Sequence, residues 1–489
     1  MITYTNQIQI LHLSDIHFGA HHICNPPHDG ASAGFPKLAD LISEDLQSDF
    51  DGLISPKENT DSPLIIAASG DFTQRAEHNE FVEAGNFLVK LTDQPLLGKK
   101  VARKNIYTIP GNHDVTFAAS SHEERFQPYI NFYNKFYENI RPTAASHHAE
   151  KLTQIHIDNL NGNKIFIVEI NCSMYVQQGT VDSSRGQIDM ESIRRLRLEL
   201  TELAQKPDYN DYIKIAMMHH HVVLLPSFIE AGRGVDSILN AGYLLELLSS
   251  NNFHLILHGH KHYPQIFNYE PLPLWSANST NIPQLVISGG SCGSNELPNW
   301  VNTACNTYGL ITIKWHPAAK QARVRVITRG LIRIGYGLLA PDQWYWKTLN
   351  VSDKILRPYH TIPEVGNLSI EKLSDAEDIE RKERYAEQRG KMPVVEVMPS
   401  LVPGQAYEVR AWIVSHDNMV LNKEQELASV EWSAGKMFAK IVCNDDDNPK
   451  FSISYHYWGP MLIQAKLNFK DGYTTNTFIY ARLPKDESR

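Results

Sequence analysis

The chain has 489 residues, more than one ordinary domain holds, so we expect two or three domains. Hydrophobic residues make up 42% and charged residues 21%, a balance that excludes wholesale disorder. The 46 Lys and Arg residues against 55 Asp and Glu residues give a net charge of −9, which argues against non-specific coating of nucleic acid. The 22 histidines are an unusual number, and only their spacing can assign them a chemistry.

The N-terminal segment and the cysteines favour a cytoplasmic protein. Residues 1–10 lack the basic start and apolar core of a secretory signal, and no apolar run approaches the roughly 18 residues of a spanning helix, so we expect no membrane contact. The five cysteines are scattered and form no C-x-x-C pair, which speaks against a disulfide framework or a cysteine zinc site.

Short runs rich in Ile, Val and Leu recur along the first two thirds of the chain. Polar residues or Gly and Pro follow each run, which is typical of buried central strands. The predicted strands are Ile8–Leu13, Leu64–Ala68, Ile106–Ile109, Ile165–Ile170, Ile213–Met218, Phe253–Leu257 and Gln284–Ser288. Helical patterns lie between several of them, at Phe35–Leu46, within Ser121–Asn139, at Met190–Ala204 and at Ile238–Leu248. This alternation predicts a layered α/β domain, which we place at residues 1–338.

The composition changes over residues 339–395. Acidic and basic residues mix between Ser369 and Lys391, which favours a solvated helix or connector with i,i+4 ion pairs over a binding tail. From residue 396 to 489 apolar residues recur with period two, as in Met461–Phe469, and turn signals separate the runs. We therefore expect a small C-terminal all-β domain, an immunoglobulin-like sandwich being our preferred form.

Polar clusters stand directly after five of the predicted strands. They are Ser14-Asp15-Ile16-His17, Gly70-Asp71, Gly111-Asn112-His113-Asp114, His219-His220-His221 and Gly259-His260-Lys261-His262. Ligands of α/β sheets collect at the carboxyl ends of strands, so these side chains are expected to meet. Carboxylates, an amide oxygen and imidazoles form an N/O ligand set that suits Mn²⁺, Fe or Zn²⁺. One such cluster arises often by chance, whereas five in this order do not.

The order of the clusters resembles the calcineurin-like metallophosphoesterase superfamily, over residues 8–335. The resemblance implies a layered β-sandwich flanked by helices and a site for two divalent metal ions, with Mn most expected and Fe, Zn or Mg as alternatives. It implies that one ion is held by Asp15, His17, Asp71 and His262, and the other by Asp71, Asn112, His219 and His260. Asp71 would then bridge the two ions.

The resemblance also implies the catalytic residues. A hydroxide bridging the two ions would attack the phosphodiester, and His113 would stabilise charge or protonate the leaving oxygen. Asp114 would orient the imidazole of His113. The triple histidine leaves two alternatives for one ligand, since either His219 or His220 fits the pattern.

The substrate is expected to be a nucleotide or a related small phosphodiester. The triple histidine and Asn112-His113-Asp114 resemble bacterial cyclic-nucleotide phosphodiesterases. The segment Ser14–Gly19 also resembles nuclease branches of the superfamily, so a DNA or RNA nuclease is the alternative. A hypothesis of another class is that the C-terminal β domain binds a protein partner, or acts as a sensor that controls the esterase domain. A homo-oligomer is compatible with the sequence.

Overall fold

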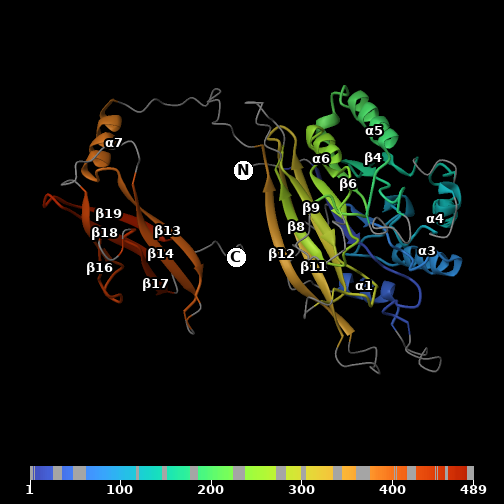
Figure 1. The fold of residues 1–489 in the computed structure, drawn as a ribbon, viewed down its shortest axis with the longest axis horizontal. Coiled ribbons are helices and arrows are strands. Elements are labelled where there is room, and N and C mark those ends of the chain that lie inside the picture. The colour runs from blue at the N-terminus through green and yellow to red at the C-terminus, as the bar shows by residue number, and fades with distance from the viewer. Residues whose placement is uncertain are drawn as a thin grey trace. The chain divides into compact units, whose positions relative to one another are not determined.

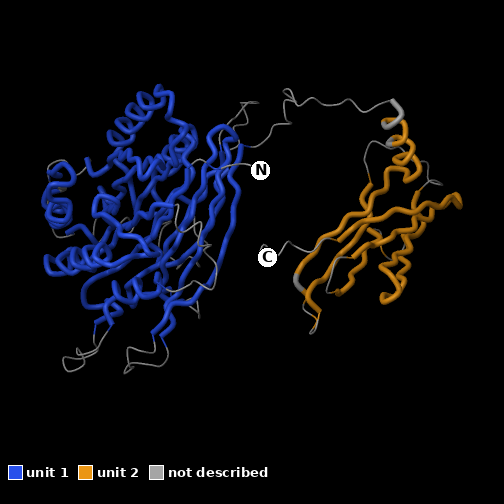
Figure 2. Tube along the Cα trace, turned by 180° about the vertical axis from the view of Figure 1, so that it is seen from behind, with its two compact units in different colours: residues 1–364 blue, residues 365–489 orange. Residues whose placement is uncertain are grey.

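The structure of the chain is a computed structural model that divides into two compact units. It describes residues 6–25, 36–47, 62–116, 121–145, 151–176, 185–223, 237–270, 282–298, 304–333, 344–358, 375–400, 405–415, 426–445, 450–457 and 461–481, with Tyr4, Val402 and Asn448 singly. Unit 1 covers residues 1–364 and unit 2 residues 365–489 (Figure 2). No helix of the described ranges is both long and apolar enough to cross a bilayer.

Two six-stranded sheets form the centre of unit 1. The first has the order β12 (Trp344–Leu356), β11 (Gln321–Arg333), β10 (Thr307–His316), β1 (Asn6–Leu13), β2 (Leu64–Ala68) and β3 (Ile106–Thr108). The second has the order β4 (Gln154–Leu160), β5 (Asn163–Glu169), β6 (Ile213–Met217), β7 (Leu255–His258), β9 (Gln284–Gly289) and β8 (Pro264–Tyr269). The runs β1-β2-β3 and β5-β6-β7-β9 are parallel, and the other pairs are antiparallel.

The two sheets pack face to face, and helices cover their outer faces (Figure 1). In β1, Ile8 and Ile10 face the second sheet, whereas Leu11 and Leu13 face the helices, because successive side chains of a strand alternate. Helices α1 (Leu38–Gln47), α3 (His78–Asp93) and α4 (His122–Phe136) share a core with the first sheet, and α5 (Met190–Leu203) and α6 (Ala241–Ser250) share one with the second. The layered β-sandwich flanked by helices is therefore confirmed.

Unit 2 is a small two-sheet domain preceded by helix α7 (Asp375–Glu387). One sheet holds β13 (Lys391–Pro399), β14 (Tyr407–Ser415) and β17 (Ile453–Tyr457). The other holds β16 (Ile441–Asn444), β15 (Leu427–Ser433), β18 (Met461–Phe469) and β19 (Thr474–Ala481). Both sheets contribute to one core around the fully buried Trp432. Three strands facing four is the count of immunoglobulin constant-type sandwiches, and the expected C-terminal β domain is present.

The observed units begin and end elsewhere than the sequence suggested. Strand β12 lies inside the expected connector of residues 339–395, yet it pairs with β11 along its whole length and belongs to unit 1. The C-terminal sandwich begins before residue 396, because β13 already pairs with β14 from Lys391 onward. The predicted solvated helix is α7, with i,i+4 pairs Asp378–Lys382 at 2.6 Å and Glu380–Arg384 at 3.0 Å.

Candidate metal centre

The polar clusters meet where the parallel strands of both sheets end. Strands β1, β2 and β3 of the first sheet lead into the segments that carry Asp15, Asp71 and Asn112. Strands β6 and β7 of the second sheet lead into those that carry His219 and His260. The backbone N–H of His260 donates to both carboxylate oxygens of Asp15, at 3.1 and 3.0 Å, so the two sheets are joined directly at the site.

A first group of ligand atoms surrounds the carboxylate of Asp15. Its Oδ1 lies 3.4 Å from Nε2 of His262 and 3.9 Å from Nε2 of His17. The two imidazole nitrogens lie 3.1 Å from each other. Three donor atoms that converge on one point in this way can hold one divalent cation.

The carboxylate of Asp71 faces two groups at once. Its Oδ2 lies 3.5 Å from Nε2 of His17 and 3.2 Å from Nε2 of His219. Its Oδ1 accepts a hydrogen bond from the backbone N–H of His113 at 2.8 Å. Asp71 is therefore the side chain placed to join two neighbouring cations.

A second group of ligand atoms surrounds the amide of Asn112. Its Oδ1 lies 3.0 Å from Nε2 of His219 and 2.9 Å from Nδ1 of His260. The side chain of Asn112 is 5% exposed and that of His219 is fully buried, so solvent does not compete for these atoms. Together with Asp71 this is a second N/O set, and the seven residues fit a pair of divalent cations by their donor chemistry.

The geometry separates His219 from His220. His219 faces Asp71 and Asn112, as described above, whereas Nδ1 of His220 lies 3.1 Å from the sulfur of Cys172. Gly186 packs directly against the ring of His220, and an added Cβ at Gly186 would lie 2.5 Å from that ring. The arrangement thus favours His219 as the ligand.

The structure differs from the sequence-based expectation for Asp114. Its carboxylate accepts hydrogen bonds from the backbone N–H groups of Gly111, Phe72 and Thr73 at 2.9 to 3.2 Å, and from the hydroxyl of Thr73. The ring of His113 instead places Nδ1 2.8 Å from the carbonyl oxygen of Gln74. Asp114 therefore fixes the loop after Asp71 rather than the imidazole of His113.

Backbone carbonyls orient three of the rings, and sequence reasoning missed them. Besides Gln74 beside His113, the carbonyl of Ser69 lies 2.9 Å from Nδ1 of His219, and the carbonyl of Glu296 contacts Nδ1 of His262. Such partners fix which nitrogen of each ring faces the centre. Because every residue has a carbonyl, no residue type in the sequence could have signalled them.

Five of the seven predicted ligands have left-handed backbone conformations. The φ angles are 50° for Asp15, 52° for His17, 53° for Asp71, 79° for His260 and 53° for His262. Non-glycine residues in this region are uncommon and concentrate at functional sites. The strand ends therefore turn sharply at the same residues that carry the ligand atoms.

Burial and neighbouring charge set the protonation of the site. Burial would raise the pKa of Asp71, but His219 and His113 beside it hold that pKa well below the ordinary value. Burial lowers the pKa of His17 to about 3, so its ring is neutral and offers a lone pair. Burial would also lower the pKa of His219, yet the Asp71 carboxylate raises it to about 9. A divalent cation between these two side chains would replace the proton that His219 holds.

The centre opens to solvent on the side of His113. His113, His260 and His262 are partly exposed, whereas Asp15 and Asp71 are buried. The carbonyl of Glu296 contacts Nδ1 of His262, and the exposed carboxylate of Glu296 lies 4.0 Å from Nε2 of the exposed His21.

Comparison with known families agrees with this geometry. The sequence model described as calcineurin-like phosphoesterase matches residues 8–264. That range is more than half of the chain and holds all the ligand candidates, so the chain belongs to the calcineurin-like phosphoesterase family. A second model, described as the prokaryotic YEATS domain, matches residues 407–482 in unit 2.

Several solved structures resemble the chain at low identity. Purple acid phosphatase PPD1 from yellow lupin (Lupinus luteus) seeds is 10% identical with a TM-score of 0.40, over 71% of this chain and 54% of its own. Phosphopantetheinyl hydrolase PptH from Mycobacterium tuberculosis is 13% identical with a TM-score of 0.32, over 59% and 91%. Vps29 from Chaetomium thermophilum is 9% identical with a TM-score of 0.27, over 72% and 99%. Among curated proteins no sequence matches.

Proposed function

We propose that this calcineurin-like phosphoesterase hydrolyses phosphodiester bonds of nucleotides or related small molecules, with two divalent cations, Mn²⁺ first among them. The observation that carries the proposal is the position of Asp71, whose Oδ2 faces His17 on one side and His219 on the other. Two bound cations would polarise the phosphate and lower the pKa of a water molecule between them. Buried ligands that are held in place before binding favour such chemistry, because they need little rearrangement.

His113 is the residue we assign to proton transfer. Its Nδ1 lies against the carbonyl oxygen of Gln74, which can only accept, so Nδ1 keeps its proton. A proton that the opposite nitrogen, Nε2, has taken up is then the one that the ring can give to the leaving oxygen of the substrate. The partial exposure of His113 leaves room for a substrate beside the ring.

The rim of the site favours a small substrate over a nucleic acid. The Glu296 carboxylate lies at the open side, where a long polyanion would meet its negative charge. The net charge of −9 acts in the same direction.

The test is a substrate panel with Mn²⁺ and full-length protein. We expect turnover of bis(p-nitrophenyl) phosphate and of a cyclic mononucleotide or dinucleotide, and little cleavage of single-stranded DNA. Asp71→Asn should lower kcat/KM by roughly 10³-fold, because several kcal/mol of transition-state stabilisation depend on the cations. Glu191→Gln, the same chemical change on the exposed part of α5, should leave kcat/KM unchanged.

The outcomes separate the alternatives. Wild-type turnover by a folded Asp71→Asn variant would sink the proposal. Preferred cleavage of single-stranded DNA would replace the small-substrate assignment with the nuclease alternative. Turnover of p-nitrophenyl phosphate alone would make the protein a phosphomonoesterase.

A further inference from the structure

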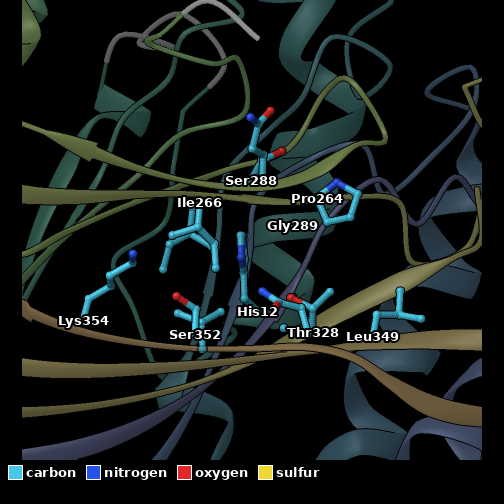
Figure 3. A pocket seen from close by; sticks show the side chains of 14 residues that line it. His12, Pro264, Ile266, Ser288, Gly289, Thr328, Leu349, Ser352 and Lys354 are labelled. Atoms are coloured by element: carbon cyan, nitrogen blue, oxygen red, sulfur yellow. The ribbon is translucent and has the colours of Figure 1, made fainter. Parts of the chain in front are cut away.

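A cavity of unit 1 lies between the two sheets. Its volume is about 370 Å³, and residues of β1, β8, β9, β10, β11 and β12 line it (Figure 3). None of the seven candidate metal ligands is among these lining residues. The volume falls in the range of small-molecule sites.

Strand β12 turns its polar face into this cavity. Lys354 pairs with Val324, Ser352 with Val326 and Asn350 with Thr328, and cross-strand partners lie on the same face of a sheet. Val324 and Val326 belong to the core between the sheets, so the polar residues of β12 face inward as well.

The outward face of the same strand is mixed. Val351 and Ile355 on this face are 37% and 59% exposed, and Asp353 between them pairs with Arg325 at 3.0 Å. Packing alone does not explain the polar residues at the inward positions, because apolar residues there would extend the core between the sheets.

Polar groups in this cavity lack partners among the residues that the structure describes. Lys354 is partly buried and makes no hydrogen bond or ion pair with any described residue. His12 is fully buried, and its Nε2 lies 2.9 Å from the hydroxyl of Ser69 while its Nδ1 has no partner. An unpaired buried polar group is unfavourable, and a ligand that bonds to it would offset this cost.

The lining specifies the kind of ligand. None of the described lining residues carries a carboxylate, so Lys354 gives the cavity a positive charge. Figure 3 shows Lys354 and His12 on either side of Ile266, all three lining the cavity. The rest of the apolar wall is formed by Ile287, Val326 and Leu349.

We propose that this cavity binds a small organic monoanion with a compact apolar body. The anionic group contacts Lys354, the body lies against Ile266 and its apolar neighbours, and a polar atom bonds Nδ1 of His12. The site is separate from the metal centre, and its occupation requires no turnover.

The experiment is calorimetric titration of the full-length, metal-loaded protein with four matched probes. We expect benzoate and benzenesulfonate to bind at least tenfold more tightly than neutral benzamide, and cationic benzylamine not to bind. Benzenesulfonate should also bind Asp71→Asn, since that variant alters only the metal centre. This last arm keeps the cavity proposal separate from the proposed function.

Variants of β12 locate the binding. Lys354→Met should weaken both anions at least tenfold and leave benzamide unchanged, and Lys354→Arg should restore anion binding. Lys347→Met removes an exposed lysine of the same strand that does not line the cavity, and it should bind like the wild type.

The competing explanation is that Lys354 points inward to discourage pairing of an edge strand with another chain. That explanation predicts that Lys354→Met self-associates in light scattering and that no probe binds the wild type. This result would overturn the proposal, as would equal affinity for benzoate and benzamide, or unchanged anion affinity in Lys354→Met.

Discussion

The two units are both built from packed sheets, yet unit 1 buries ionisable side chains whereas unit 2 keeps them partly exposed. In unit 1 the ends of strands β1, β2, β6 and β7 carry buried carboxylates and imidazoles. In unit 2 the charged residues of the sheets lie at partly exposed positions and pair across strands, as Glu431 does with Lys440 and Lys466. The core of unit 2 is apolar around Trp432.

This difference points to the functional site of the chain. Buried polar groups are unfavourable for folding, and those of unit 1 converge on the candidate metal centre, as ionisable groups of functional sites do. The surface pairs of unit 2 cost little and contribute little, so they carry no comparable signal. The following predictions test whether the two units really differ in this respect.

The largest expected effect is that of metal removal. Treatment with a chelator should abolish phosphodiester hydrolysis, and added Mn²⁺ should restore it. Hydrogen exchange should rise in the segments around Asp15 and Asp71, whose carboxylates lose their counter-ions, and stay constant in β14 and β18. Faster exchange throughout unit 2 would show that the units are not independent.

The second effect concerns Glu169, a fully buried carboxylate of β5. It accepts hydrogen bonds from Arg141 at 3.1 Å and from the backbone of Thr108 at 3.1 Å, and it lies 2.9 Å from Nε2 of His156. Glu169→Gln keeps the shape but leaves Arg141 buried without its counter-charge, so the free energy of unfolding should fall by about 3–5 kcal/mol.

Urea denaturation checks the Glu169 prediction. The matched variant Glu431→Gln breaks a partly exposed pair of unit 2 and should leave the midpoint nearly unchanged. Equal losses in the two variants would contradict the contrast between buried and exposed pairs.

A smaller effect is expected at Asp114. In Asp114→Asn an amide NH₂ would meet backbone N–H donors of Gly111 or Phe72, so the loop that holds Asp71 should loosen. Residues that support metal ligands typically contribute about 10–100-fold to activity or metal affinity. Elemental analysis and kcat/KM with Mn²⁺ measure both.

The control for Asp114 is Asp189→Asn at the start of α5. That carboxylate also accepts from a backbone N–H, that of Ser192 at 2.9 Å, but it lies in another loop. If both variants lost activity equally, the role assigned to Asp114 would be wrong.

The smallest expected effect is a pH dependence of the free energy of unfolding that arises from Lys214 of β6. Its Nζ donates to the carbonyl of Asn251 at 2.8 Å and lies 3.4 Å from the ring centre of Tyr209, and burial lowers its pKa to about 7. Between pH 7 and the ordinary lysine value near 10.4 the unfolded chain binds a proton that the folded chain does not, so stability rises with pH. Below pH 7 both states are protonated and this dependence ends.

Urea unfolding at pH 7, 8 and 9 measures this slope. Relative to Lys214→Met, the wild type should gain on the order of 1 kcal/mol per pH unit. Lys466→Met in unit 2 should keep the wild-type slope. Identical slopes in wild type and Lys214→Met would show that the lysine keeps its charge in the folded state.

The general plan of unit 1 was predictable from the sequence because buried parallel strands leave a strong apolar pattern. The polar residues after β1, β2, β3, β6 and β7 then indicated the candidate site, because the carboxyl ends of parallel strands lie along the same edge of a sheet. The alternation in β18 predicted the β-rich unit 2 in the same way, and Met461, Ile463 and Ala465 are buried there.

The remaining features depend on contacts between distant segments. Strand β12 was not predicted, because polar residues occupy several of its inward positions, next to a cavity, while Val351 and Ile355 face outward. Helix α3 was missed, because Gly85 and Asn86 in its middle are weak helix formers, although Phe81, Ala84 and Leu88 form an uninterrupted buried face. The partner of Asp114 could not be chosen, since a carboxylate accepts equally well from an imidazole or a backbone N–H.

The left-handed turns at Asp15, His17, Asp71, His260 and His262 limit how this site can vary. Asp, Asn and His are the side chains other than glycine that tolerate this conformation best. The residue types that we expect to bind the cation are therefore also those that the backbone accepts with least strain. A β-branched replacement would lose the ligand atom and strain the turn together, so a saturation library at these positions should return active clones confined to a few residue types.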